Sequence, residues 1–208
     1  MTVAQSHLDE LWDFADPVGS ESRLRAAVQR EADPSTRAEL GTQVARALGL
    51  QKRFEEADAV LDAVTPEGSA AVVRTALERG RLRNSAGNAD AAIPFFRAAA
   101  DGASRAGLLF LEVDALHMLA IADPERSEAW TDAALDVLER TQDPRTLRWR
   151  VTLHSNAGWS LFDAGRLPDA LARFEAARDA AARWGTPEQV TWAEEALAEV
   201  GTAASEQE

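Results

Sequence analysis

Apolar side chains recur along most of the chain at intervals of three and four residues, which is the spacing of one face of an α-helix. The last such stretch is typical: Val190, Ala193, Leu197 and Val200 form one stripe, and glutamates form another. No segment shows the sustained alternation of apolar and polar residues that a half-buried strand requires. The pattern predicts an all-α protein.

Five residue pairs mark expected helix starts, because each places a hydrogen-bond acceptor directly before a proline. They are Asp33-Pro34, Thr65-Pro66, Asp123-Pro124, Asp143-Pro144 and Thr186-Pro187. The short stretches between apolar patterns make consecutive helices antiparallel neighbours. We expect helices over residues 34–50, 54–64, 67–86, 89–101, 104–122, 125–141, 144–164, 168–184 and 187–203.

The first 33 residues predict a shorter helix pair that covers one end of the array. Ser6 to Asp9 resembles a capping box and opens a helix that reaches Phe14. The turn-forming residues 16–19 end that helix, and a second runs from Ser20 to Ala32. Farther along, Pro94 is expected either to delay or to kink the helix that contains it.

One arrangement of small and large residues occurs four times along the chain. In the last copy, Gly158 and Ala170 lie where two helices approach closely, and Leu161 and Phe174 fill the gap beside them. In every copy we expect an alanine to be the small residue of the second helix at this close approach, and we call this residue the anchor. The expected anchors are Ala57, Ala92, Ala129 and Ala170.

These copies resemble the tetratricopeptide repeat, whose 34-residue unit carries W-x2-L-G-x2-Y, then A-x3-F, then P. The resemblance implies a superhelical stack of antiparallel helix hairpins, an α-solenoid with a concave groove. It covers roughly residues 34–184. The expected segments are a helix pair at 1–33, repeats at 34–65, 66–103, 104–142 and 143–184, and a capping helix with a tail at 185–208.

Charge and composition exclude several classes of function. The formal net charge is −13, which argues against binding to nucleic acid or to an anionic membrane surface. Cysteine is absent, so disulfides and thiolate metal sites are excluded. Residues 1–10 lack the features of a signal peptide, and no apolar run approaches ~18 residues. These observations favour a cytoplasmic protein.

Catalytic chemistry has little support in the sequence. No phosphate-binding loop, dinucleotide fingerprint or nucleophile elbow is present, so we expect no enzyme activity and no cofactor. His117 and His154 lie on first helices of adjacent repeats, with Asp114 one turn before His117. They are interpreted either as a metal site or, more simply, as two packing histidines.

The resemblance implies that the first helix of each repeat lines the groove. Trp159 follows the conserved glycine, and Asn156 occupies a position where family members often hold a ligand backbone. The arginines either accept a carboxylate or form ion pairs with Glu39 and Glu78 on the same helices. The expected partner-binding residues are Arg46, Arg74, Arg81, Asn84, Asp114, Met118, Ser155, Asn156, Trp159 and Phe162.

The leading functional hypothesis is therefore a non-enzymatic scaffold that binds a peptide or helix of another protein in its groove. A second hypothesis is self-association into a homo-oligomer through an apolar groove or an end helix, and its sequence feature is the apolar run from Leu108 to Leu111. A third is a small-ligand sensor, for which the two histidines are the only feature. The sequence leaves the partner, the oligomeric state and the openness of the groove undetermined.

Overall fold

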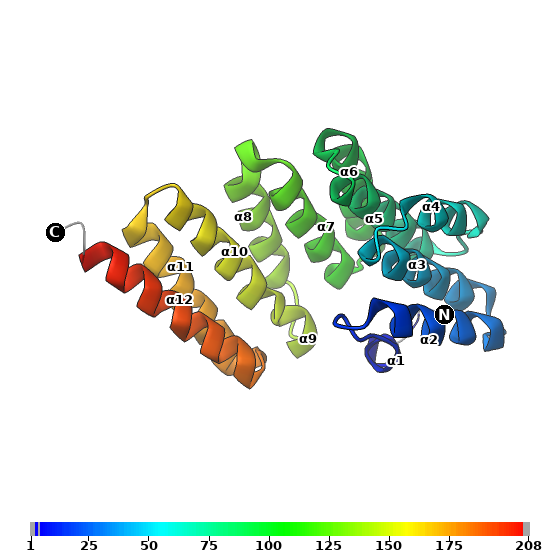
Figure 1. The fold of residues 1–208 in the computed structure, drawn as a ribbon, viewed down its shortest axis with the longest axis horizontal. Coiled ribbons are helices and arrows are strands. Elements are labelled where there is room, and N and C mark those ends of the chain that lie inside the picture. Colours follow the sequence, from blue (N-terminus) through cyan, green and yellow to red (C-terminus); the bar gives the residue numbers. More distant parts are fainter. Residues whose placement is uncertain (1–2, 4, 206–208) are drawn as a thin grey trace. The chain divides into compact units, whose positions relative to one another are not determined.

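The computed structural model describes residue 3 and residues 5–205 (Figure 1). Over this range the chain forms helices and no strand, which confirms the predicted all-α class. The described helices are not long and apolar enough for any of them to cross a membrane. Two compact units divide the chain, residues 1–124 and residues 125–208. We call them the N-terminal unit and the C-terminal unit.

Each unit is built from helices that pack against their neighbours in the sequence. The N-terminal unit contains α1 (Gln5–Leu11), α2 (Pro17–Arg30), α3 (Pro34–Leu50), α4 (Phe54–Ala63), α5 (Ser69–Ser85), α6 (Ala89–Ala106) and α7 (Leu109–Ala122). A 3-10 turn, η1 (Pro124–Arg126), follows. The C-terminal unit contains α8 (Ser127–Leu138), α9 (Pro144–Leu147), α10 (Trp149–Asp163), α11 (Leu167–Trp184) and α12 (Pro187–Ser205). Adjacent pairing of helices agrees with the α-solenoid prediction.

Three of the five predicted helix starts are confirmed by their hydrogen bonds. The Asp33 carboxylate accepts from the Thr36 N–H at 2.8 Å, and that of Asp143 accepts from Thr146 at 2.9 Å. Thr186 forms a reciprocal capping box with Gln189 before α12.

The other helix starts differ from expectation. The helix expected after Thr65 begins only at Ser69, after Gly68 in the left-handed region, and the segment after Asp123 forms a 3-10 turn. Asp16, read as part of a helix end, instead caps α2 by accepting from the Gly19 N–H.

Helix ends depart from the predictions mainly where glycine ends a helix. The helix expected to stop at residue 101 continues through Pro94 to Ala106 and ends at Gly107, whose φ is 67°. That helix begins at Ala89 as expected, so Pro94 does not delay it. The connection after α8 is longer than predicted and contains the extra turn α9.

The tight crossings are confirmed by the space around two glycines. A Cβ at Gly80 would lie 2.4 Å from the Phe96 ring, and a Cβ at Gly158 would lie 2.8 Å from the Phe174 ring. Both distances are too short for real carbon atoms, so each glycine admits the ring of the paired helix. Ala92 and Ala170, one turn before the rings, are fully buried as expected.

The prediction that Ala129 is the anchor of the third copy is wrong, because this residue is exposed. The buried positions of α8 are Thr131, Ala134, Val137 and Leu138, of which Thr131, Ala134 and Leu138 have the same spacing as Phe96, Ala99 and Ala103 on α6. Ser127 is therefore the counterpart of Ala92, 35 residues later, and Ala170 follows after another 43. The longer connection around α9 accounts for the additional eight residues.

A left-handed residue ends the first helix of three pairs. Gly87 and Gly165 have φ values of 83° and 72°, and Lys52 takes the same place with φ 60°. In each turn the next N–H donates to a carbonyl five residues earlier, as from Arg53 to Leu48 at 3.0 Å. Lysine thus holds a conformation that favours glycine.

Candidate functional site

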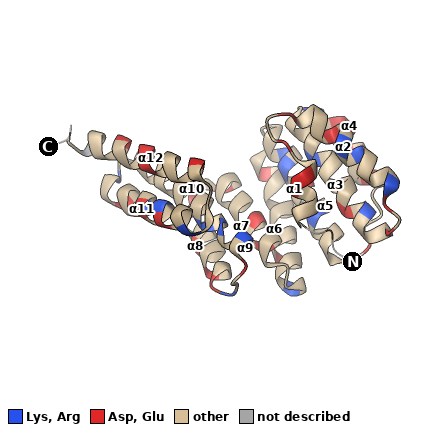
Figure 2. Ribbon diagram, turned by 90° about the horizontal axis from the view of Figure 1, so that it is seen from below, with Lys and Arg blue, Asp and Glu red and all other residues tan. Residues whose placement is uncertain are grey.

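Ionised side chains gather on α3, α5 and α7 of the N-terminal unit. Figure 2 shows residues of both signs on the helices of this unit. The group that we call the charged cluster consists of three arginines and three acids, of which the acids and Arg74 are buried and Arg46 and Arg81 are partly buried. Its members are Glu39, Arg46, Arg74, Glu78, Arg81 and Asp114.

The first ion pair of the charged cluster joins α3 to α5. The Arg74 Nε donates to Glu39 Oε2 at 3.1 Å, and Glu39 is 0% exposed. Burial raises the pKa of Glu39, and the charge of Arg74 opposes that rise only in part. Arg74 therefore has an internal partner, but this pair joins two helices, whereas the sequence predicted pairing within one helix.

Arg81 bridges two acids from different helices. It donates to Glu78 on its own helix and to Asp114 on α7, each at 2.5 Å. Burial disfavours the charged form of Asp114, but the guanidinium groups of Arg81 and Arg46 outweigh it and lower the pKa. Burial lowers the pKa of His117 on the same helix, so this histidine is neutral at pH 7.

Arg46 differs from the other two arginines. Its guanidinium lies over the rings of Trp12 and Phe14, with centroids 5.7 and 5.4 Å away, and among the described residues it forms no ion pair. Glu78 is 1% exposed, and its Oε2 accepts no hydrogen bond. A guanidinium and a carboxylate oxygen in one cluster thus retain bonding capacity that the described residues do not use.

The N-terminal segment, which we define as residue 3 and residues 5–14, covers this face. The Val3 N–H donates to Glu39 Oε1 at 3.2 Å, and Arg74 donates to the Gln5 side chain at 3.3 Å. The indole of Trp12 donates to Gln43 at 3.1 Å. Leu8 of α1 is buried in the same core as residues of α2 and α3. Part of the expected groove is therefore filled by the chain itself.

The remaining expected residues make none of the contacts of this cluster. Asn84 and Met118 are partly exposed on α5 and α7. Asn156 is exposed on α10, while Trp159, 36% exposed, lies edge-on against Phe174 at 5.0 Å and Phe162 at 5.7 Å. Ser155 is partly buried on the same helix. Arg46, Arg74, Arg81 and Asp114 come together, whereas Ser155, Asn156, Trp159 and Phe162 belong to the C-terminal unit.

Several residues of this face were not predicted as contact residues. Gln43, Gln5 and Trp12 hold the N-terminal segment in place. A signal for the charged pair was present, because Glu39 and Arg74 are 35 residues apart and so occupy the same position in consecutive helix pairs. No comparable spacing identified the N-terminal residues.

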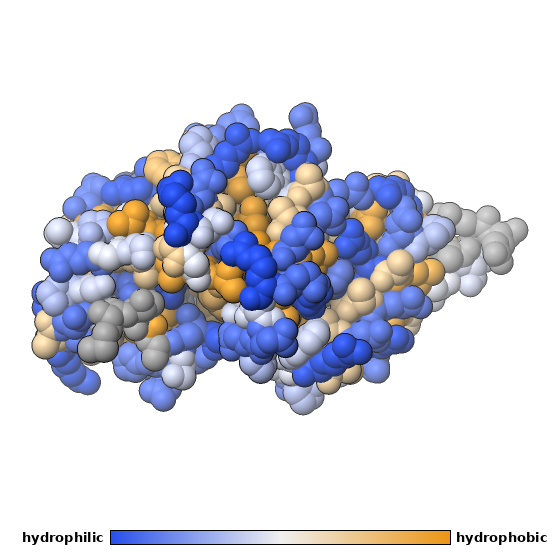
Figure 3. All heavy atoms as spheres, turned by 180° about the vertical axis from the view of Figure 1, so that it is seen from behind, coloured by the Kyte–Doolittle hydropathy of each residue, from blue (hydrophilic) through white to orange (hydrophobic). Residues whose placement is uncertain are grey.

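Two other expectations receive less support. The run from Leu108 to Leu111 is partly to fully buried, so it is not the exposed apolar patch that self-association was expected to use. Figure 3 shows hydrophobic residues interspersed with hydrophilic ones on one face of the molecule. Within the described residues, histidine, aspartate and glutamate form no group of three that could hold a metal ion.

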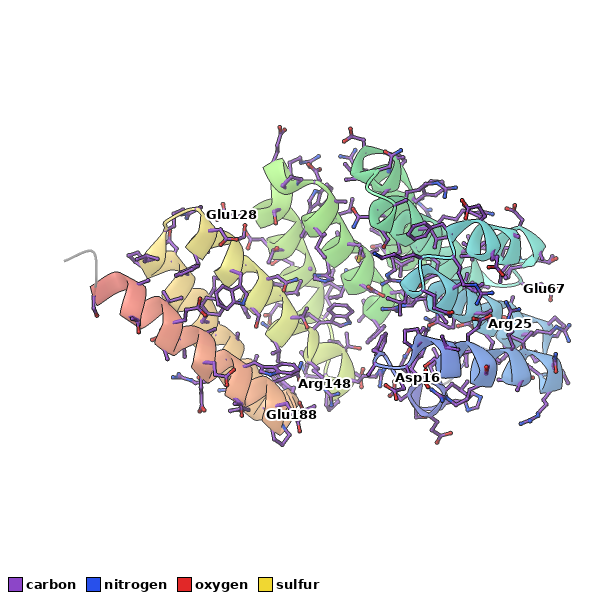
Figure 4. All side chains as sticks on the ribbon, viewed as in Figure 1. Asp16, Arg25, Glu67, Glu128, Arg148 and Glu188 are labelled. Atoms are coloured by element: carbon purple, nitrogen blue, oxygen red, sulfur yellow. The ribbon has the colours of Figure 1, made fainter. Side chains whose placement is uncertain are left out.

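A cavity of about 510 Å³ lies among α2, α3 and α4, with Arg25 and Glu67 in its lining (both labelled in Figure 4). Both arginines of its lining already have partners. Arg25 pairs with Glu21 at 2.8 Å, and Arg37 donates to the Glu31 carbonyl. The charged cluster therefore remains the better candidate for binding in this unit.

Comparisons with known proteins give a fold likeness. The sequence matches no protein-family model and no curated protein. Among solved structures, the crystal structure of BtubC (BKLC) from P. vanneervenii is similar, with a TM-score of 0.66 and 15% sequence identity. The similarity covers 95% of this chain and 84% of that chain. At this identity the likeness supports the helical fold and carries no functional information.

Proposed function

We propose that this protein is a non-enzymatic binding module that holds a polypeptide segment of a partner against α3, α5 and α7. The observation that carries the proposal is the contact of the N-terminal segment with this face. That segment uses a backbone N–H, an amide side chain and an aromatic ring. A surface that holds its own chain in this way has the chemistry to hold another.

The buried ion pairs support this role by fixing the groups that face the segment. Glu39 is held by Arg74, and its second oxygen is the one that accepts the Val3 N–H. A main-chain contact tolerates many side chains, while the Arg46 guanidinium favours an aromatic residue stacked on it. The partner segment that suits this face therefore carries an aromatic residue.

The tetratricopeptide-like pattern is further support. Helix pairs with glycine or alanine at close crossings are typical of that family, and its arrays present extended binding surfaces. The proposal includes two further statements: the chain is a member of this family, and it is cytoplasmic, as its composition led us to expect.

A competition experiment tests the proposal on the full chain. A fluorescent peptide of residues 1–15 is titrated into the wild type and into a Gln5→Ala/Trp12→Ala variant, whose own segment is loosened. We expect the variant to bind the peptide at least about tenfold more tightly, because a tethered segment competes at high effective concentration. Fluorescence anisotropy measures both affinities.

Two further variants separate recognition from general effects. Arg46→Gln in the loosened chain should weaken peptide binding, since it removes the cation that stacks on the aromatic rings. Arg105→Gln, an exposed arginine at the end of α6, should leave it unchanged. Equal peptide affinity of wild-type and loosened chains would contradict the proposal.

A further inference from the structure

The C-terminal unit contains a cavity of about 380 Å³ where the start of α10 meets the end of α11. Arg150 and His154 of α10 and Asp179, Arg183 and Trp184 of α11 line it, together with two alanines of α11. Arg148, labelled in Figure 4, fixes this corner by donating to the Trp184 carbonyl at 2.9 Å. The lining residues belong to the C-terminal unit and the charged cluster belongs to the N-terminal unit, so this inference is independent of the function proposed above.

The lining is cationic and has an aromatic wall. The guanidinium groups of Arg150 and Arg183 each lie 5.9 Å from the centroid of a Trp184 ring. Arg183 forms no ion pair with any described residue. The one carboxylate of the lining, on Asp179, already accepts from Arg178 at 2.9 Å. Because Arg150 pairs with Glu139 at 2.6 Å, Arg183 is the arginine of this lining that no acid among the described residues neutralises.

Two buried nitrogen atoms in the lining lack hydrogen-bond partners. The Arg150 Nη2 donates to Glu139 at 2.6 Å, but its Nε reaches no acceptor. The Nδ1 of His154 is likewise buried without a partner. Burial and the charges of Arg173 and Arg150 lower the pKa of His154 to about 4, so the imidazole is neutral at pH 7. These atoms are donors, or a neutral donor–acceptor, suited to a polar ligand.

The equivalent helix pair of the N-terminal unit, α5 and α6, can be compared with α10 and α11 position by position. Gly80 and Phe96 match Gly158 and Phe174, which sets a register of 78 residues between the two helix pairs. In that register Arg105 corresponds to Arg183. Small residues occupy the other positions in α5 and α6: Val72, Ala76 and Ala106 stand where the C-terminal unit has Arg150, His154 and Trp184. Packing of the helix pair therefore does not require the three large polar or aromatic side chains.

We propose that this cavity binds a small aromatic carboxylate. The carboxylate of the ligand pairs with the exposed guanidinium of Arg183, which forms no ion pair with a described residue. The ring of the ligand lies against Trp184 and the small alanine side chains. His154 is neutral at pH 7 and adds no charge to the lining.

Isothermal titration calorimetry on the full chain tests the proposal with three probes at constant ionic strength. Benzoate carries both the charge and the ring, acetate carries only the charge, and benzyl alcohol carries only the ring. We expect saturable binding of benzoate, and affinity at least about tenfold weaker for each of the other two. Absence of saturable benzoate binding would overturn the proposal, and so would equal affinity for acetate.

Matched variants assign the binding to this cavity. Arg183→Gln and Trp184→Leu should each weaken benzoate binding about tenfold, whereas Arg105→Gln removes the same charge at the equivalent position of α6 and should change nothing. Thermal melts of all three variants verify that they fold. If a folded Arg183→Gln variant binds benzoate as well as Arg105→Gln does, the assignment is wrong. Because Arg46→Gln leaves this cavity intact, failure of the peptide proposal and failure of this one are distinguishable.

Discussion

At the residue scale, the fold depends on a few positions where size or backbone conformation leaves little choice. Gly158 admits the ring of Phe174, and no larger residue fits at the observed helix separation. Ala170 and Phe174 are both 0% exposed. These residues were identifiable from the sequence, because a small residue and a large one at fixed spacing follow directly from close packing of two helices.

The packing of the Phe174 ring against Gly158 predicts that two substitutions lower the free energy of unfolding. Phe174→Ala should lower the free energy of unfolding by about 3–5 kcal/mol, because it leaves a cavity in a fully buried site. Gly158→Ala should lower it by about 1–3 kcal/mol, because the new methyl group overlaps the ring. Urea denaturation measures both. A neutral effect of either change would contradict the observed crossing.

Lys52 offers a stabilising substitution. Lys52→Gly should raise the free energy of unfolding by about 1 kcal/mol, because the residue has φ 60° and glycine adopts that region without steric cost. Lys52→Ala is the matched control: it removes the same charge but keeps the Cβ, so it should give no comparable gain. Similar stability of the two variants in urea denaturation would show that charge, not conformation, matters here.

At the scale of elements, the helices were more predictable than their register. α3 lies over residues 34–50 as predicted, since Asp33 and Pro34 specify its start chemically. The register predicted for the third helix pair was wrong by two residues, because Thr131 takes the position that Phe96 and Phe174 hold in two other helix pairs. A helix rich in alanine, such as α8, offers several equally plausible buried stripes. Only its contacts distinguish them.

The corrected register predicts opposite responses at two alanines. Ala92→Leu should lower the free energy of unfolding by about 1–3 kcal/mol, because Ala92 is fully buried at a helix crossing. Ala129→Leu should change it by less than about 0.5 kcal/mol, because this residue is exposed on α8. Thermal denaturation of both variants is sufficient, and a large loss for Ala129→Leu would restore the original register.

At the scale of the whole molecule, the sequence predicted the class of fold and the internal ion pairs as one alternative, but not how the binding face is covered. Gln5 and Trp12 reach Arg74 and Gln43 across long stretches of chain through side chains alone. No periodicity connects such residues. The buried acids and histidines also change the stability of the whole chain with pH, in directions that their surroundings determine.

His154 should make the chain less stable in mild acid. Its folded pKa of about 4 lies below the ordinary value of 6.5, so the unfolded chain takes up the proton first as the pH falls. Stability that is present above pH 6.5 is therefore lost progressively between pH 6.5 and 4. Burial raises the pKa of Glu39 and acts in the opposite sense, so the effect of His154 is obtained by difference.

A His154→Gln variant isolates that contribution. Melting temperatures of wild type and variant are measured from pH 7.5 to pH 4. The wild type should lose more of its melting temperature than the variant below pH 6.5. Parallel curves would mean that His154 keeps an ordinary pKa in the folded protein.

The bond from the Val3 N–H to Glu39 has a practical consequence for anyone who handles this protein. An affinity tag or surface linker fused ahead of Met1 joins the chain two residues from that main-chain contact, beside the face proposed to bind partners. Immobilisation by the amino end would then disturb the surface under assay. Attachment after Glu208 joins the chain in the C-terminal unit, which contributes no residue to the charged cluster.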